Sequence, residues 1–178
     1  AVIMTGATPV FCEVDKKTFC IDPEEIRKLL DKDTKAIVPV HLYGQAANMD
    51  EILKIARENS LQVVEDAAQG VGVKYKNQHV GTLGDLGILS YYGNKTITCG
   101  EGGIILTNNK ELRDSCYRIK NHGRDTKGGY IHHHVGYNFC FTDLQAAIGL
   151  AQMDKLQKII DRKKKIYDTY SRGLASLS

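Results

Sequence analysis

Short apolar runs alternate with segments of helical periodicity along most of the chain. Runs typical of buried strands lie at 36–40, 61–65 and 87–92, and further strands are expected at 9–14 and 102–107. Segments in which apolar residues recur every three or four positions separate several of these runs. Strands separated by helices of about 10–15 residues are typical of crossover units, so the pattern predicts an α/β fold with a mostly parallel sheet.

The expected helices have recognisable starts. Asp22 is followed by Pro23 and two glutamates, which combines an N-cap acceptor, a proline in the first turn and acids near the helix N-terminus. Asn48 is expected to cap the next helix, whose apolar residues share one face. A further helix is predicted over 110–120, and from Thr142 the helical pattern continues almost to the end of the chain.

Composition and charge exclude several classes of protein. The chain has 178 residues, of which 42% are hydrophobic and 25% charged, as in soluble globular domains. A net charge of +3 gives no case for a nucleic-acid partner, and no apolar run approaches the roughly 18 residues of a membrane helix. The 5 cysteines are irregularly spaced without a C-x-x-C pair, so we expect reduced thiols in a cytoplasmic protein.

A carboxylate stands at the end of one predicted strand. Ligands of parallel sheets bind beyond the carboxyl ends of the strands, which directs attention to Asp66 in the segment V-E-D-A-A-Q. The two alanines that follow leave space for a flat ligand beside this carboxylate. On the residues alone, Asp66 could equally be the N-cap of a helix.

A lysine follows another predicted strand. Lys95 ends the sequence S-Y-Y-G-N-K that starts at Ser90, and an ammonium near a core must be paired, desolvated or used chemically. Desolvation favours the neutral amine, which can condense with an aldehyde, and the hydroxyls of Ser90 and Thr96 could donate to a phosphate. By itself, Lys95 fits a surface lysine as well.

The glycine-rich stretches carry less information. Gly100–Gly103 (G-E-G-G) allows either a close backbone approach or a plain turn. Gly81, Gly84 and Gly87 do not match G-x-G-x-x-G and do not precede a helix, so a dinucleotide fingerprint is excluded.

The order of the motifs is more specific than any one of them. After V-E-D-A-A-Q come, in this order, G-D, S-Y-Y-G-N-K-T, G-E-G-G, H-G, G-Y-N and D-L-Q-A-A-I-G-L. This set, which runs from about Thr8 to the last predicted helix, resembles the DegT/StrS family of pyridoxal-phosphate sugar aminotransferases. Within the family, the stretch from Ser90 to Gly103 looks most like the branch that forms perosamine.

The resemblance implies a fold and a place in a longer chain. It implies the central part of the large domain of a type I pyridoxal-phosphate transferase, with helices on both faces of the sheet. Residues 1–152 would belong to this cofactor-binding domain, and 153–178 would be a long helix leading toward a small C-terminal domain. Family members are much longer and carry a further N-terminal segment, so we expect this chain to be a fragment.

The resemblance also implies roles for individual residues. Lys95 matches the lysine that holds pyridoxal 5'-phosphate covalently, and Asp66 matches the carboxylate beneath its ring nitrogen. Gln69 matches the residue that hydrogen-bonds the ring oxygen, and Ser90 matches a phosphate ligand. Asn138 matches a residue that, in family homodimers, reaches the phosphate in the neighbouring subunit's site.

The activity implied is transfer of an amino group from L-glutamate to C4 of a nucleotide-linked 4-keto-6-deoxy sugar, with GDP-4-keto-6-deoxymannose as the favoured substrate. By analogy this points to surface polysaccharide (O-antigen, lipopolysaccharide) synthesis. Relatives with histidine at the position of Lys95 are dehydratases, and this chain keeps the lysine. Two alternatives stay open: an aminotransferase of the same fold acting on another ketosugar or a cyclitol, and a non-catalytic sugar-binding or regulatory scaffold.

Other polar residues have simpler interpretations. His41 and Tyr43 follow a strand and could line the substrate side, but packing explains them equally well. We expect no metal at His132–His134, because three adjacent histidines do not face one ion easily; a solvated loop is the better prediction. Arg162–Lys165 is expected to be a solvated helix face, and Cys99 a small core residue rather than a nucleophile.

Overall fold

The computed structural model describes all residues except Lys127 and Ser178. Contacts within the chain divide it into two units. The first comprises Ala1–Leu89 and Ile105–Leu112, and the second comprises Ser90–Ile104 and Arg113–Ser178.

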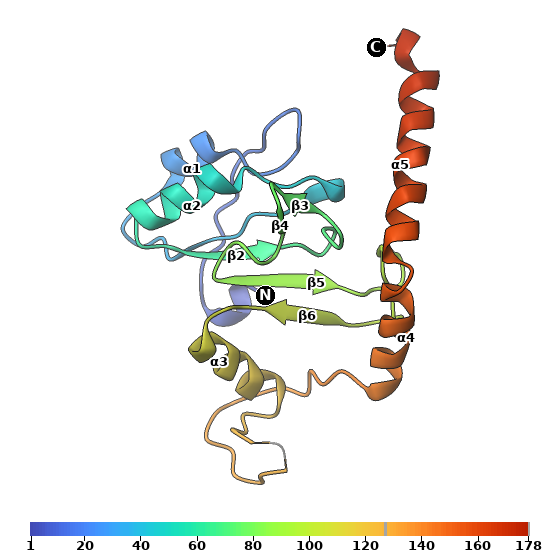
Figure 1. The fold of residues 1–178 in the computed structure, drawn as a ribbon. Coiled ribbons are helices and arrows are strands. Elements are labelled where there is room, and N and C mark those ends of the chain that lie inside the picture. Colours follow the sequence, from blue (N-terminus) through green and yellow to red (C-terminus); the bar gives the residue numbers. More distant parts are fainter. Residues whose placement is uncertain (127, 178) are drawn as a thin grey trace. The chain divides into compact units, whose positions relative to one another are not determined.

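The first unit is built on a mostly parallel sheet, as the sequence predicts. The strands lie in the order β1-β2-β5-β6, and both β1 with β2 and β2 with β5 pair in parallel. Strand β6 runs in the opposite direction to β5 (Figure 1). The end of β5 and the start of β6 are grouped with the second unit. The strands are β1 (Ala36–Ile37), β2 (Gln62–Asp66), β5 (Leu86–Ser90) and β6 (Gly103–Leu106).

Two helices, α1 (Pro23–Leu29) and α2 (Met49–Glu58), cover one face of this sheet (Figure 1). Their apolar residues form a buried core with the inward side chains of β1 and β2, because helical spacing gathers them on one side. The core residues of these helices and strands are Ile26, Ile37, Met49, Ile52, Ile55, Ala56 and Val63.

Two strand predictions need correction. Residues 9–14 form no strand: only an isolated bridge joins Val14 to Ile21, and Phe11 is 91% exposed. An apolar run becomes a strand only where a neighbouring strand pairs with it, and none does here. The strand expected over 36–40 is shortened to β1, because Pro39 has no N–H to donate to a ladder.

The helix starts are confirmed, with one difference in how they are capped. The Asp22 carboxylate accepts from the N–H of Glu24 at 2.9 Å, as predicted. Asn48 stands at the N-cap of α2 but makes no capping hydrogen bond. Its Oδ1 instead accepts from the hydroxyl of Tyr75 at 3.2 Å, and that hydroxyl accepts from the N–H of Asp50 at 3.4 Å. A phenol distant in the sequence therefore takes the place of the cap.

Tyr75 belongs to a hairpin, β3 (Lys74–Tyr75) and β4 (Gln78–His79), that the apolar pattern did not predict. We expect Tyr75→Phe to destabilise the fold by about 1 kcal/mol, because α2 loses the acceptor for one of its first N–H groups. Urea unfolding measures this change. Lys76→Ala, which removes the exposed ion pair between Lys76 and Asp50 on the same hairpin, should unfold like the parent; equal effects of both variants would contradict the capping role.

The second unit contains the loop after β5 and the C-terminal helices. Helix α3 (Lys110–Lys120), whose first residues belong to the first unit, has the predicted bounds, and the stretch 123–141 lacks helices and strands where it is described. The start at Thr142 is confirmed by a capping box with Gln145. The helical pattern expected from Thr142 almost to the end of the chain is divided between two helices.

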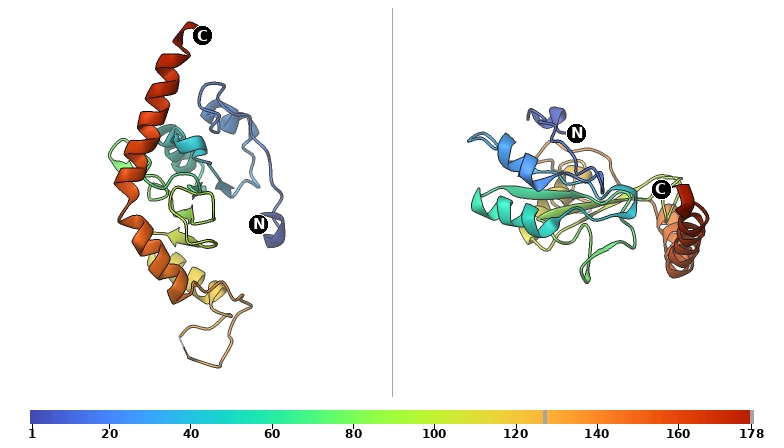
Figure 2. Two further views of the ribbon diagram at one scale, coloured as in Figure 1. Left: turned by 90° about the vertical axis from the view of Figure 1, so that its right-hand side faces the viewer. Right: turned by 90° about the horizontal axis from the view of Figure 1, so that it is seen from above.

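Two helices, α4 (Asp143–Met153) and α5 (Leu156–Gly173), follow each other almost end to end (Figure 2). Between them the N–H of Lys155 donates to the carbonyl of Gln152 at 3.0 Å, a tight turn that interrupts the helical ladder. Whether α5 leads to a further domain stays a prediction.

Over the residues that the structure describes, no helix is both long and apolar enough to cross a membrane.

Candidate functional site

Asp66 is the last residue of β2, at the carboxyl end of the parallel sheet. Its Oδ1 accepts from the N–H of Ala68 at 3.0 Å, which closes a turn. No helix begins there, so the N-cap interpretation of Asp66 is wrong. The second carboxylate oxygen accepts no hydrogen bond from the described residues and is available to a ligand.

Gln69 follows in the same turn region and has its side chain exposed. Its Oε1 accepts from the N–H of Tyr43 at 2.9 Å. This contact orients the amide, because with its oxygen bonded to Tyr43 the two N–H donors of Nε2 point elsewhere. Tyr43 has a φ of 52° and Gly44 a φ of 79°. A left-handed backbone at a tyrosine is uncommon, and here it aims the Tyr43 N–H at Gln69.

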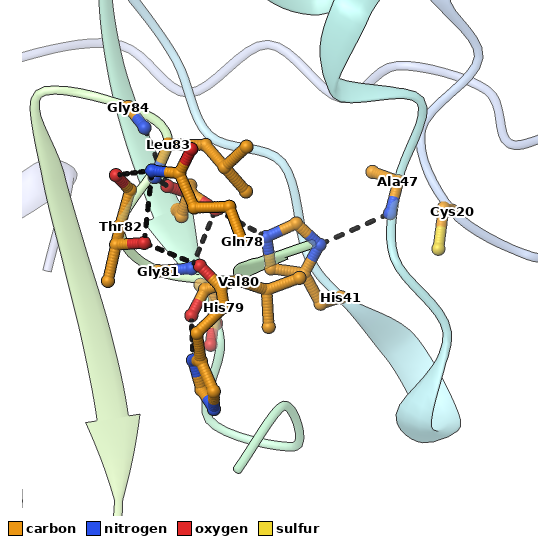
Figure 3. Close-up of polar contacts among 12 residues, drawn as sticks. Cys20, His41, Ala47, Gln78, His79, Val80, Gly81, Thr82, Leu83 and Gly84 are labelled. Carbon is orange, nitrogen blue, oxygen red and sulfur yellow. Dashed lines mark hydrogen bonds and ion pairs between the residues drawn. The ribbon is translucent and has the colours of Figure 1, made fainter. Parts of the chain in front are cut away.

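His41 has a packing role, which decides between the two alternatives the sequence leaves open. Its side chain is 0% exposed, and both ring nitrogens are used (Figure 3). Nδ1 accepts from the N–H of Ala47 at 3.2 Å, so the ring proton is on Nε2, which lies 2.9 Å from the Glu65 carboxylate. The expectation that His41 lines the substrate side is therefore wrong. Tyr43, whose side chain is 75% exposed, is free to do so.

Glu65 is a buried carboxylate that sequence reasoning missed. Its Oε1 accepts from the N–H groups of Leu83 and Gly84, both at 2.6 Å, and its Oε2 accepts from Gly81 at 2.7 Å and from His41. Burial by itself raises the pKa of the Glu65 carboxyl, but these hydrogen bonds favour the charged form more strongly and hold the pKa below its usual range. The available signal was its place in the strand, because Glu65 alternates in phase with the buried Leu61 and Val63.

The Glu65 contacts tie together three parts of the first unit: the segment after β1, strand β2, and the turn before β5. Figure 3 shows the His41 ring with Ala47 on one side and the turn of Gly81–Gly84 on the other. Because Asp66 is the next residue after Glu65, this cluster fixes the end of the strand that carries Asp66.

Lys95 lies in the loop after β5 and is half-buried. Its backbone N–H donates to the carbonyl of Tyr92 at 3.0 Å. The Ser90 hydroxyl oxygen accepts from the backbone N–H of Tyr92 at 3.3 Å. The residues on either side, Tyr91 and Ile97, are buried and anchor the loop. Within the described part of the chain, no carboxylate pairs with the Lys95 ammonium, so its amine is available for chemistry.

Cys99 is a core residue, as predicted. It is 6% exposed, and burial raises the pKa of its thiol, which disfavours the nucleophilic thiolate. Its Sγ donates to the carbonyl of Glu101 at 3.4 Å. The thiol therefore helps to shape the G-E-G-G turn.

Asn138 lies in the loop between α3 and α4, where it forms an isolated backbone bridge with Asn121. Its side chain is exposed and makes no hydrogen bond to the described residues. Its neighbours Tyr137 and Phe139 stack on each other with ring centroids 5.0 Å apart. The structure thus holds Asp66 with Gln69 in the first unit, and Ser90, Lys95 and Asn138 in the second.

The histidines of this loop have ordinary partners. His132 Nδ1 lies 2.6 Å from the carbonyl of His122, and His133 Nε2 lies 3.8 Å from the carboxylate of Asp125. Among the described residues, no group of three or more His, Cys, Asp or Glu side chains is arranged to hold a metal ion.

Comparison with known proteins finds similar sequences and structures over nearly the whole chain. The sequence profile of the DegT/DnrJ/EryC1/StrS aminotransferase family matches residues 1–178. GDP-perosamine synthase of Escherichia coli O157:H7 is 43% identical over 177 residues, which are 99% of this chain and 49% of that protein.

Solved structures of other proteins are similar to this chain as well. DesV of S. venezuelae in complex with a ketimine intermediate is 33% identical with a TM-score of 0.93, over 99% of this chain and 47% of that one. NtdA of Bacillus subtilis with bound cofactor PMP is 35% identical with a TM-score of 0.86, over 99% of this chain and 40% of that one. The chain therefore spans about half the length of the proteins it matches.

Proposed function

This chain belongs to the DegT/DnrJ/EryC1/StrS aminotransferase family, and we propose that it forms the central part of a cytoplasmic, pyridoxal-phosphate-dependent sugar aminotransferase. The observation that carries the proposal is the ordered motif set with its lysine retained at Lys95, in a chain 43% identical to a GDP-perosamine synthase. The retained Lys95 and Asp66 argue against a non-catalytic scaffold.

The free polar groups fit the cofactor. Asp66 offers an unbonded carboxylate oxygen, as a protonated ring nitrogen requires, and Gln69 offers N–H donors for the phenolic ring oxygen. The Ser90 hydroxyl accepts from Tyr92 and keeps its own proton to donate to a phosphate. Lys95 supplies the amine. Each group matches the polarity of the atom it would contact.

Pyridoxal phosphate supplies an electron sink for carbanions when it is bound. In the proposed site, the Asp66 anion keeps the proton on the pyridine nitrogen. Lys95 would hold the cofactor through its amine and would act as the acid–base group that takes up and returns a proton during amino transfer. Such acid–base work by a positioned side chain contributes about 10²–10⁴ in rate. The oriented amide of Gln69 holds the ring in place.

For the substrates we propose L-glutamate as donor and a nucleotide-linked 4-keto-6-deoxy sugar as acceptor, with GDP-4-keto-6-deoxymannose favoured. The support is the likeness to a protein named GDP-perosamine synthase and the perosamine-like stretch from Ser90 to Gly103. A place in O-antigen synthesis follows from the same likeness. Competition by GDP-sugars and UDP-sugars separates this substrate from other ketosugars or cyclitols.

We also propose a homodimer whose sites are shared. Asn138 has an exposed amide without a hydrogen bond among the described residues, and apolar residues that follow it in the sequence are exposed: Phe139 is 65% exposed, Leu144 79% and Ile148 51%. An apolar surface of this kind marks a protein contact. Light scattering of the full-length protein tests the dimer, and an active monomer would contradict the role given to Asn138.

The direct test of the cofactor is reduction of the full-length protein with borohydride in the presence of pyridoxal phosphate, followed by peptide mass mapping. We expect one phosphopyridoxyl adduct, on Lys95. Absence of any adduct would remove the proposed function.

A further inference from the structure

The basic run of α5 makes one contact that the sequence did not predict. Arg162–Lys165 is exposed, as expected of a solvated helix face. Lys163 nevertheless donates from Nζ to the hydroxyl oxygen of Thr96 at 2.9 Å. Thr96 is the residue directly after Lys95, and the contact lies within the second unit. A side chain far along the sequence thus reaches the chain beside the proposed catalytic lysine.

Other contacts show that the C-terminal part of the chain holds this loop. Gln145 of α4 donates from Nε2 to the carbonyl of Glu101 at 2.8 Å. The ring of Phe141 lies against Gly102, where an added Cβ would approach it to 2.3 Å. The loop that carries Lys95 is therefore held near Gly102 by Phe141 and α4, and at Thr96 by α5.

The Lys163 contact differs from the other two because it reaches the residue next to Lys95. Backbone hydrogen bonds fix the main chain of the loop on its Tyr92 side, but the Thr96 side chain is held by Lys163. A hydrogen bond from a charged donor is stronger than one between neutral groups. The contact at Thr96 therefore bears on the position of its neighbour Lys95.

We propose that Lys163 is a positioning residue for Lys95: through its hydrogen bond to Thr96 it fixes the loop directly after the cofactor-bearing lysine. This inference rests on the proposed function, since it concerns the lysine that would hold the cofactor. It gives a role to one residue of the basic run and none to its neighbours. Lys164, the next residue on α5, is exposed without a hydrogen bond or ion pair among the described residues, which makes it a matched control.

The experiment compares Lys163→Met, Lys163→Arg, Thr96→Val, the Thr96→Val/Lys163→Met pair and Lys164→Met in the full-length protein. Affinity for pyridoxal phosphate is measured by titration, and thermal unfolding is followed without cofactor. We expect Lys163→Met to weaken cofactor binding about threefold without lowering the unfolding temperature, because the loop is no longer held at Thr96. Lys163→Arg, which keeps a charged donor, should restore the parental affinity, and Lys164→Met should match the parent.

The double variant tests the route through Thr96. If the contact carries the effect on affinity, the double variant should bind the cofactor no more weakly than Lys163→Met alone. Strictly additive losses would overturn the proposal, as would a Lys163→Met protein that keeps the parental affinity for pyridoxal phosphate. A parent protein that binds no pyridoxal phosphate would instead overturn the proposed function and this inference with it.

Discussion

Replacing Lys95 by alanine in the full-length protein is expected to abolish amino transfer while leaving the fold intact. The loop around it is held by backbone hydrogen bonds and by the buried Tyr91 and Ile97, none of which involves the Lys95 side chain. In the proposed mechanism, loss of the amine would leave the cofactor without covalent attachment and the substrate carbon without a base. We expect a loss of at least about 10²–10⁴ in kcat, measured by glutamate-dependent turnover of the nucleotide ketosugar.

The matched control for this prediction is Lys164→Ala, which removes an exposed ammonium from the same unit. It should retain parental turnover. Thermal unfolding should be similar for both variants, since neither lysine side chain supports the core. Substantial activity in Lys95→Ala would remove this residue from the mechanism.

We expect the second large effect from a substitution of Glu65, which should lower the free energy of unfolding. Glu65→Gln keeps the size of the side chain but replaces an acceptor oxygen with an NH₂ group. In one orientation of the amide that group would face the N–H groups of Leu83 and Gly84, and in the other those of Gly81 and His41. His41 has no alternative tautomer, because Nδ1 already accepts from Ala47. Donors facing donors in a buried site should cost roughly 3 kcal/mol.

Urea unfolding of the full-length protein measures this loss, which is a large share of an unfolding free energy of about 5–15 kcal/mol. Glu13→Gln, at an exposed glutamate of the same unit, is the control and should leave the midpoint unchanged. Because Glu65 precedes Asp66, we also expect weaker cofactor binding in Glu65→Gln. A Glu65→Gln protein as stable as the parent would show that the cluster does not hold the strand end.

The same carboxylate predicts the direction of a pH dependence. Its pKa is lowered in the folded protein, so on acidification the unfolded chain takes up this proton first. The stabilisation from Glu65 is then complete above the ordinary glutamate pKa of about 4.3 and is lost as the pH falls through the folded value.

Unfolding free energies of the parent and of Glu65→Gln, measured from neutral pH downward, should therefore converge in acid. Parallel curves would mean that the Glu65 pKa is the same in the folded and unfolded chains.

The elements that sequence predicted well depend on neighbours along the chain. The apolar spacing of α2 and the acid and proline at the start of α1 act within one or two turns, so they could be identified without a fold. The ordered motifs were also sufficient to indicate the family, because they can be read from the sequence without knowledge of the fold. The parallel sheet followed from the alternation of strands and helices.

Errors arose where the outcome depends on partners far along the sequence. The run at 9–14 has the composition of a strand but no neighbouring strand, and Asn48 has the composition of a cap but bonds Tyr75 instead. Neither result is visible locally, because an apolar run or a polar side chain takes the partner that the tertiary structure presents.

The candidate site shows the same difference between what the sequence and what the tertiary structure determine. Sequence by itself identified the residues of the proposed site: the lysine, the aspartate, the glutamine and the serine, which follow or end strands of the sheet. Only the tertiary structure decided that His41 is buried against Glu65, that Tyr43 orients Gln69, and that Lys163 reaches Thr96. The physical reason is that hydrogen bonds are short-ranged in space, whatever the distance along the chain. The fold must bring donor and acceptor to about 3 Å before their residue types acquire these roles.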